Sequence, residues 1–166
     1  DEEQLAHLSF HDTLTSFYNR NRYIKDSEAL QNSHIPVGVV YLDVNGLKDV
    51  NDKRGHSYGD RLLMEAAKRL REVFYDADLY RIGGDEFILY LACDGKSQET
   101  LRDKLSRLRE DWDGVIGKLK LSFPVTFSVG VAHYPSDGDN YRGLWPVADK
   151  ALYEAKKSRS EEHTSE

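Results

Sequence analysis

The feature that most restricts the fold of this chain is a short, unbroken apolar run at residues 37–42, which stops at the carboxylate of Asp43. The run is rich in β-branched side chains, a composition typical of a strand that is covered on both faces. Such a strand needs other elements packed on each side of its sheet. The rest of the chain must therefore supply amphipathic helices and further strands.

Apolar periodicity supplies both kinds of element. Residues 58–74 carry apolar side chains on one stripe and charged ones opposite, which predicts an amphipathic helix. Residues 83–86 begin with two glycines, which readily adopt positive φ, so they predict the turn of a hairpin. The expected helices cover residues 13–31, 58–74, 101–112 and 144–155, and the expected strands cover residues 37–42, 79–82, 87–92 and 125–131.

This order of elements favours a single, mostly antiparallel sheet covered by helices over a doubly wound parallel sheet. We therefore predict an α+β domain with a ferredoxin-like βαββαβ core. In this sheet Tyr80 and Tyr90 are expected to be packing residues, since buried aromatic rings are ordinary sheet contacts.

Composition narrows the class of partner. The 166 residues include 23 basic and 29 acidic side chains, a net charge of −6, which argues against binding of a nucleic acid backbone and leaves a small anionic ligand open. Cys93 is the only cysteine, so no disulfide framework exists and a reducing compartment is expected. No apolar run approaches the roughly 18 residues of a membrane span. We expect a cytoplasmic domain without membrane contact of its own, whose full-length parent can still be membrane-anchored.

Three acids stand at places where the predicted elements end. Taken alone, Asp43 is better explained as a turn former. If the hairpin pairs beside the strand at 37–42, however, Asp85 and Glu86 approach Asp43, and like charges that close require a cation. Oxygen ligands suit Mg²⁺ or Mn²⁺, and the arrangement is similar to a two-metal site for phosphoryl or nucleotidyl transfer.

The residues around this turn carry a family resemblance. The string 81–87, Arg-Ile-Gly-Gly-Asp-Glu-Phe, resembles the signature of GGDEF domains, the diguanylate cyclases. Further family segments appear in the family's order, so that the resemblance covers about residues 10–158. They lie at residues 12–20, 42–60, 128–132 and 148–156. The resemblance implies a core related to polymerase-palm and nucleotide-cyclase domains.

The resemblance also implies a reaction. Two GTP molecules, one on each of two facing copies of the domain in a transient homodimer, condense to cyclic di-GMP and two pyrophosphates. Asp85, Glu86 and Lys48 are the implied catalytic residues. Two Mg²⁺ or Mn²⁺ ions per active site would be held by Asp43, the Val44 carbonyl, Asp85 and Glu86.

Substrate contacts follow from the same family pattern. Asn51 and Asp60 match the pair that reads guanine, because an amide and a carboxylate can together address O6, N1–H and N2–H₂, and His56 would support the pocket wall. On spacing alone these three would read as loop and helix-start residues. The loop 45–48 can offer backbone N–H groups to the phosphates, while Gly83 and Gly84 leave room for the α-phosphate and ribose. The expected substrate-binding residues are Leu47, Asn51, His56, Asp60, Gly83, Gly84, Lys156 and Arg159.

Several positions depart from the family pattern or have a structural role in it. Residues 74–77 read Phe-Tyr-Asp-Ala where many relatives carry an inhibitory Arg-x-x-Asp motif, so weak product inhibition is expected there. Ser16 replaces the usual glycine, a change expected to alter a turn. Arg159 stands one place earlier than the family's arginine. The residues with an expected structural role are Asp12, Asn19 and Arg20.

The resulting domain organisation is simple. Residues 1–10 are expected to end a connecting helix from an upstream sensor domain, residues 11–159 to form the GGDEF domain, and residues 160–166 to be a tail, disordered or of foreign origin. The alternative function is a catalytically silent module that binds GTP or a partner protein. The intact signature acids favour the enzyme.

Overall fold

The computed structural model describes residues 9–33, 35–92, 97–121 and 125–134. Its elements are α2 (Arg20–Ser33), β1 (Val37–Asn45), α3 (Leu47–Arg54), α4 (His56–Val73), β2 (Asp78–Arg81), β3 (Glu86–Ala92), α5 (Ser97–Gly117) and β4 (Thr126–Tyr134). The four described strands form one sheet in the order β2-β3-β1-β4, and every neighbouring pair is antiparallel. This is the strand order of a ferredoxin-like βαββαβ core, so the predicted fold class is confirmed.

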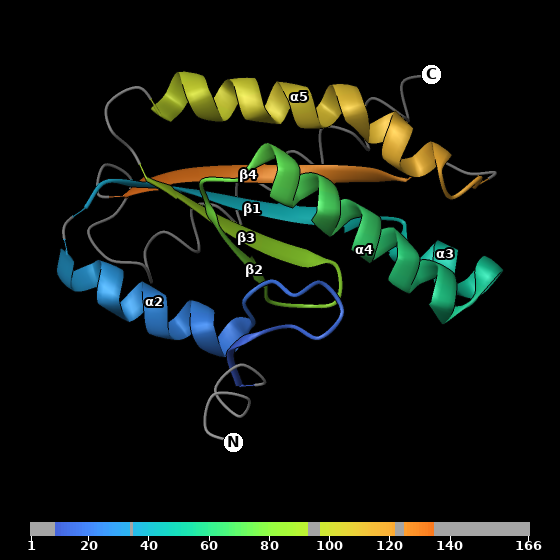
Figure 1. The fold of residues 1–166 in the computed structure, drawn as a ribbon, viewed down its shortest axis with the longest axis horizontal. Helices are drawn as coiled ribbons and strands as arrows, with labels where there is room; N and C mark the ends of the chain where they lie inside the picture. Colours follow the sequence, from blue (N-terminus) through green and yellow to red (C-terminus); the bar gives the residue numbers. More distant parts are fainter. Residues whose placement is uncertain (1–8, 34, 93–96, 122–124, 135–166) are drawn as a thin grey trace, which may run out of the picture.

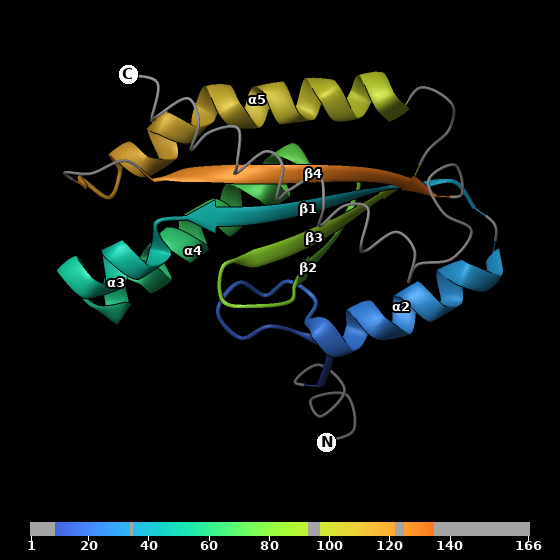
Figure 2. The ribbon, with the colours of Figure 1, turned by 180° about the vertical axis from the view of Figure 1, so that it is seen from behind.

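Helices cover the sheet on both faces (Figures 1 and 2). On one face α4 and α5 pack against a core that includes Leu42, Val44 and Phe87. On the opposite face lies α2, above a second cluster in which Tyr80 and Tyr90 are both buried. The first eight residues of β1 are all buried, as expected for a strand covered on both sides. The packing role predicted for the two tyrosines is confirmed, and the Tyr80 hydroxyl donates a hydrogen bond of 2.6 Å to Asp26.

The sequence prediction of a helix over residues 13–31 is wrong in its first third. Asp12 accepts hydrogen bonds from the backbone N–H and the hydroxyl of Thr15, which hold residues 12–17 in a turn. The helix α2 begins only at Arg20, where the side chain of Asn19 accepts a hydrogen bond from the backbone N–H of Arg22. The other elements predicted in the described ranges are present, with ends that differ by a few residues. Of the expected connecting helix at residues 1–10, residues 1–8 lie outside the described residues, and residues 9 and 10 are helical. The helix expected at 144–155 and the tail at 160–166 also lie outside the described residues.

Ser16, which stands where the family pattern has a glycine, adopts a backbone conformation that favours glycine. Its φ is +64°, in the left-handed region that costs an L-residue roughly 1–2 kcal/mol. We therefore expect Ser16→Gly to raise the melting temperature by about 2–4 °C, because relief of this strain exceeds the entropy that glycine loses on folding. Ser16→Val, with a β-branched side chain at the same φ, is expected to lower it. A Ser16→Gly variant that melts at or below the wild-type temperature in calorimetry would contradict the assignment of strain.

Candidate active site at the end of the central strands

Asp43 lies in a row of polar residues that crosses three strands. The register pairs Asp43 of β1 with Glu86 of β3 on one side and with Ser128 of β4 on the other. Directly paired residues in antiparallel strands point to the same face, with Cβ atoms about 4.5–5.5 Å apart. The Asp43 side chain is only 7% exposed, so its carboxylate is held in a largely dehydrated position beside a second acid. Like charges placed directly opposite one another favour the presence of a cation.

The hairpin turn between β2 and β3 is fastened to this end of β1. The backbone N–H of Val44 donates to the carbonyl of Asp85 at 3.0 Å, and that of Ile82 donates to the carbonyl of Glu86 at 3.0 Å. The turn carboxylates were expected to approach Asp43 if the hairpin paired beside β1, and this pairing is confirmed. One detail is corrected: β1 does not stop at Asp43 but continues to Asn45, because β4 pairs with it over those last residues.

The two turn glycines matter because they have no side chain, and not because of their backbone conformation. Neither Gly83 nor Gly84 has a positive φ, so the expectation that they supply positive φ to the turn is wrong. A Cβ atom at Gly84 would meet no atom within 4 Å, whereas one at Gly83 would lie 3.0 Å from the Glu86 carboxylate oxygen Oε2. The Glu86 side chain therefore folds back against Gly83, and the side of the turn at Gly84 is open.

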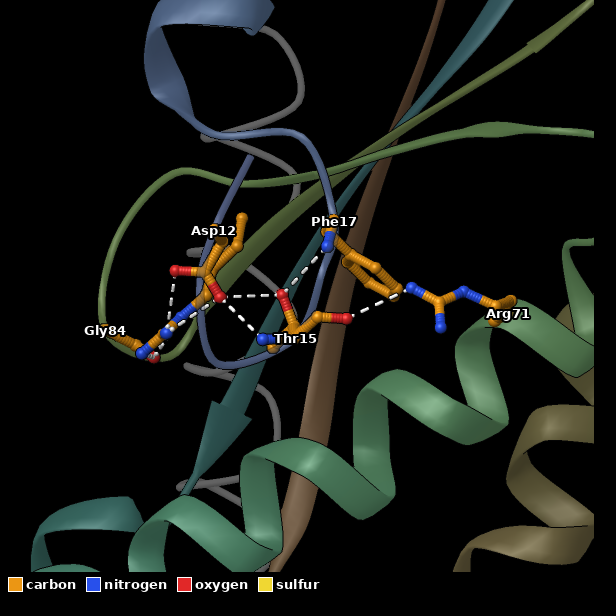
Figure 3. A network of polar contacts seen from close by, with 6 residues as sticks. Asp12, Thr15, Phe17, Arg71 and Gly84 are labelled. Carbon is orange, nitrogen blue, oxygen red and sulfur yellow. Dashed lines mark hydrogen bonds and ion pairs between the residues drawn. The ribbon is translucent and has the colours of Figure 1, made fainter. Parts of the chain in front are cut away.

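A network of charged hydrogen bonds fixes the turn from outside (Figure 3). Arg81 donates from Nη1 to both carboxylate oxygens of Asp12 at 3.1 Å, and from Nε and Nη2 to the carbonyl of Gly84 at 3.2 and 2.9 Å. Arg71 of α4 donates to the Thr15 carbonyl at 3.0 Å, which ties the same N-terminal turn to the helix. The structural role expected for Asp12 is confirmed. Burial acts to raise its pKa, but the hydrogen bonds from Thr15 and the charge of Arg81 outweigh burial and lower the pKa below its usual value.

The segment after β1 is a helix start and not the loop predicted for residues 45–48. Gly46 has a φ of +95°, which turns the chain directly into α3, and the first intrahelical bond runs from the Val50 N–H to the Gly46 carbonyl at 3.0 Å. The backbone N–H groups of Leu47 and Lys48 therefore belong to the first turn of a helix, where N–H groups have no intrahelical acceptor. A helix N-terminus suits a phosphate for the reason given for the loop, namely N–H groups that point outward. The Lys48 side chain is exposed on this turn.

The three residues predicted to form the guanine pocket gather around one corner of the chain. Asn51 is half-buried in α3, His56 is the first residue of α4, and Asp60 follows one turn later, with His56 and Asp60 both exposed. The structure thus brings the predicted pair to neighbouring turns of two helices. Lys156 and Arg159, the predicted phosphate contacts from the end of the chain, lie outside the described residues.

The segment 74–77, where many relatives have an inhibitory motif, is built differently here. Phe74 is fully buried, so the position of the usual arginine points into the core. Asp76 forms an ion pair of 2.6 Å with Lys104, which is 3% exposed and also donates to the Val73 carbonyl at 3.1 Å. Phe74 and Asp76 are thus both occupied by contacts within the domain. Weak product inhibition at this segment stays a prediction.

Sequence reasoning missed the polar residues that β4 contributes. Asn45 donates from its amide to the hydroxyls of Ser128 and Thr126 at 2.9 and 3.0 Å. Ser128 is buried directly beside Asp43 in the register. No local signal marks such a residue, because its place becomes clear only when the pairing of β4 with β1 is known.

The donor set fits a hard divalent cation that is shared with a ligand. Within the described ranges, no group of three or more His, Cys, Asp and Glu side chains is arranged to hold a metal ion by itself. Carboxylates and a backbone carbonyl are the oxygen donors that Mg²⁺ and Mn²⁺ prefer, and Mg²⁺ is usually bound through one or two carboxylates together with substrate phosphates. Asp43, Asp85 and the Val44 carbonyl therefore suit an ion whose remaining ligands come from outside the domain.

Comparisons with known proteins identify the family of this chain. The chain matches the family model described as "Diguanylate cyclase, GGDEF domain" over residues 9–162. It is 34% identical over 162 residues to the diguanylate cyclase DgcM of Escherichia coli K12, covering 93% of this chain and 38% of that protein. The fold is similar to the GGDEF domain of TpbB from Pseudomonas aeruginosa, with a TM-score of 0.69, 30% identity and 89% coverage of both chains. It is also similar to a microbial GGDEF domain studied in its interaction with cyclic di-GMP (TM-score 0.70, 29% identity, 93% and 94% coverage).

The chain therefore belongs to the GGDEF domain family, the family of the diguanylate cyclases. It spans between 20% and 48% of the length of curated relatives such as these. None of the helices in the described part of the chain is long and apolar enough to cross a membrane.

Proposed function

We propose that this chain is a catalytic diguanylate cyclase domain, which condenses two GTP molecules into cyclic di-GMP with release of two pyrophosphates. The observation that carries the proposal is the buried Asp43, paired in register with Glu86 at the end of β1 beside an intact Gly-Gly-Asp-Glu-Phe turn. A domain that had lost this chemistry would have no need to keep two acids in register at this end of β1.

The acids would hold two Mg²⁺ or Mn²⁺ ions, with Asp43, Asp85 and the Val44 carbonyl as ligands and Glu86 as an auxiliary carboxylate. Such ions, when bound, neutralise phosphate charge and make a hydroxyl more acidic. Asp85 would accept the proton of the attacking 3′-hydroxyl. As the new O–P bond forms at the α-phosphate, the bond from that phosphorus to the pyrophosphate oxygen breaks, and pyrophosphate leaves.

The remaining predicted residues would bind and orient GTP. The first N–H groups of α3, from Leu47 onward, and the Lys48 ammonium would face the β and γ phosphates. Asn51 and Asp60 would read the guanine edge, and His56 would support that wall of the pocket. The open side of the turn at Gly84, next to Gly83, would admit the ribose and α-phosphate. Lys156 and Arg159 would add phosphate contacts from the end of the chain.

The reaction needs a second copy of the domain, since each GTP supplies the hydroxyl that attacks the other. We propose that pairing is transient and is controlled by an upstream sensor domain of a longer protein, in keeping with the multidomain length of the relatives. In that protein the domain would work in the cytoplasm, without nucleic acid and without membrane contacts of its own.

The test is a product assay. The purified domain, at high concentration and also fused to a dimerising coiled coil, is incubated with GTP and Mg²⁺, and the products are identified by mass spectrometry. We expect cyclic di-GMP from the wild type and at least about a 10³-fold slower rate from Asp85→Ala, because the variant lacks a metal ligand and the proton acceptor. GTP binding without product in the fused dimer would favour the silent regulatory module. No GTP binding at all would overturn the assignment of the site.

A further inference from the structure

The corner between α3 and α4 is made by glycine. Gly55 alone joins the two helices, with φ of +88° and ψ of 164°, a backbone conformation that is essentially restricted to glycine. Its N–H donates to the Asn51 carbonyl at 2.9 Å and so ends α3, and its own carbonyl accepts from the Tyr58 N–H at 3.1 Å and so starts α4. The chain therefore changes direction between α3 and α4 within one residue.

Gly59 stands inside this corner, where glycine is otherwise unfavourable. It is buried at the end of the first turn of α4, and a glycine within a helix costs roughly 0.5–1 kcal/mol relative to alanine. Its φ is not in the left-handed region, so backbone conformation does not require glycine at this position. The reason for its presence must then be space.

The space that Gly59 leaves is filled by Asn51. A Cβ atom at position 59 would overlap the side-chain oxygen of Asn51 and would lie 2.9 Å from its Cγ and 3.2 Å from Cδ1 of Leu47. The side-chain oxygen of Asn51 therefore occupies the place that a side chain at position 59 would take. Any larger residue at 59 would force this amide into another rotamer or push α3 away from α4.

We infer that Gly59 is a positioning residue for base selectivity: its missing side chain sets the orientation of the Asn51 amide beside Asp60. The inference rests on the proposed function, in which Asn51 and Asp60 read guanine. Displacement of Asn51 removes one half of this pair. We expect the small Cβ of alanine to move the amide into another rotamer rather than to move α3, so that Asp60, Asp43 and the N-terminal turn of α3 keep their places and binding that depends on the phosphates persists.

The test measures binding rather than turnover. Dissociation constants for GTP and ATP with Mg²⁺ are determined by calorimetry for the wild type and for Gly59→Ala. We expect the GTP affinity of Gly59→Ala to fall by about tenfold or more, the loss of one well-placed hydrogen bond and the strain around it, while its ATP affinity changes less than about twofold. Gly114→Ala on α5 is the matched control, because a Cβ there meets nothing within 4 Å, and it should change neither affinity.

A double-mutant cycle separates this role from simple helix packing. In an Asn51→Ala background the alanine at position 59 has room, so Gly59→Ala should cost no further GTP affinity and little stability there. Additive losses of affinity and melting temperature in the cycle, or unchanged GTP affinity in Gly59→Ala alone, would overturn the inference. A wild type that binds ATP as tightly as GTP would refute guanine reading itself, and the failure would then lie in the proposed function.

Discussion

Replacement of Asp43 by asparagine is expected to slow cyclic di-GMP formation by at least about 10³-fold and to leave the fold intact. The change keeps the shape of the side chain and removes its charge. Because metal-assisted charge stabilisation contributes several kcal/mol to phosphoryl transfer, and each 1.36 kcal/mol is tenfold in rate, the loss of one ligand corresponds to about three orders of magnitude. Production of cyclic di-GMP with Mg²⁺ is the measurement.

The stability of the same variant gives a second readout that does not depend on turnover. Without metal, Asp43 and Glu86 repel each other across paired strands. Asp43→Asn should therefore melt at the wild-type temperature or slightly above it, and its free energy of unfolding should rise by no more than about 1 kcal/mol. With Mg²⁺ and a non-hydrolysable GTP analogue, the wild type should gain stability by mass action and the variant should gain much less. Asp113→Asn, at an exposed position on α5, is the matched control. A variant that retains activity within about tenfold of the wild type would rule out Asp43 as a metal ligand.

The strands of the sheet could be predicted from the sequence, but the end of β1 and the helix α3 could not. The apolar run at 37–42 and the two runs around Gly83 identify strands by period and composition, and their pairing follows from the order of elements. The end of β1 could not be predicted, because residues 44 and 45 are paired only with β4. The helix α3 was missed for a related reason. Of its eight residues only Val50 is buried, and so short a polar helix depends on its packing against α4.

The candidate site could likewise be predicted only in part. Asp43, Asp85 and Glu86 could be placed together from the sequence, because a carboxylate at the end of a buried strand and two more in a neighbouring turn have few other arrangements. For a glycine, by contrast, the sequence does not show whether its backbone conformation or its lack of a side chain is needed. The turn pattern suggested positive φ for Gly83 and Gly84, which the structure contradicts, and only the family resemblance suggested that they leave space.

The second large effect is expected at Arg81, where substitution should loosen the turn that carries Asp85. The guanidinium side chain is 16% exposed and makes four hydrogen bonds, two to Asp12 and two to the Gly84 carbonyl. Because hydrogen bonds to charged groups contribute about 1.5–3 kcal/mol and both partners here are partly exposed, Arg81→Ala should lose about 2–3 kcal/mol of unfolding free energy at pH 7. Cyclase activity should fall at least about tenfold, since Asp85 directly follows the released carbonyl.

Two further variants separate the shape of the guanidinium from its charge. Arg81→Lys retains the charge but cannot reach Asp12 and the Gly84 carbonyl with one planar group, so its loss should be intermediate. Arg69→Ala is the matched control. Arg69 also pairs with two carboxylates, those of Glu72 and Asp111, but these are exposed partners, so the loss should stay below about 1 kcal/mol. An Arg81→Ala loss no larger than that of Arg69→Ala would show that the network does not hold the turn.

The pH dependence identifies Asp12 as the partner of Arg81. The pKa of Asp12 is lowered in the folded state, despite burial, by hydrogen bonds from Thr15 and by the charge of Arg81. Its ionised form therefore contributes stability that is fully present above the unfolded pKa of about 3.9 and is lost as the pH falls through the lower folded value. Arg81→Ala has already lost the arginine's share of this contribution, so its deficit relative to the wild type should shrink as the pH falls from about 5 toward 3. Urea unfolding across this range measures the deficit, and a constant difference would mean that Arg81 acts through Gly84 alone and that the ion pair with Asp12 contributes nothing.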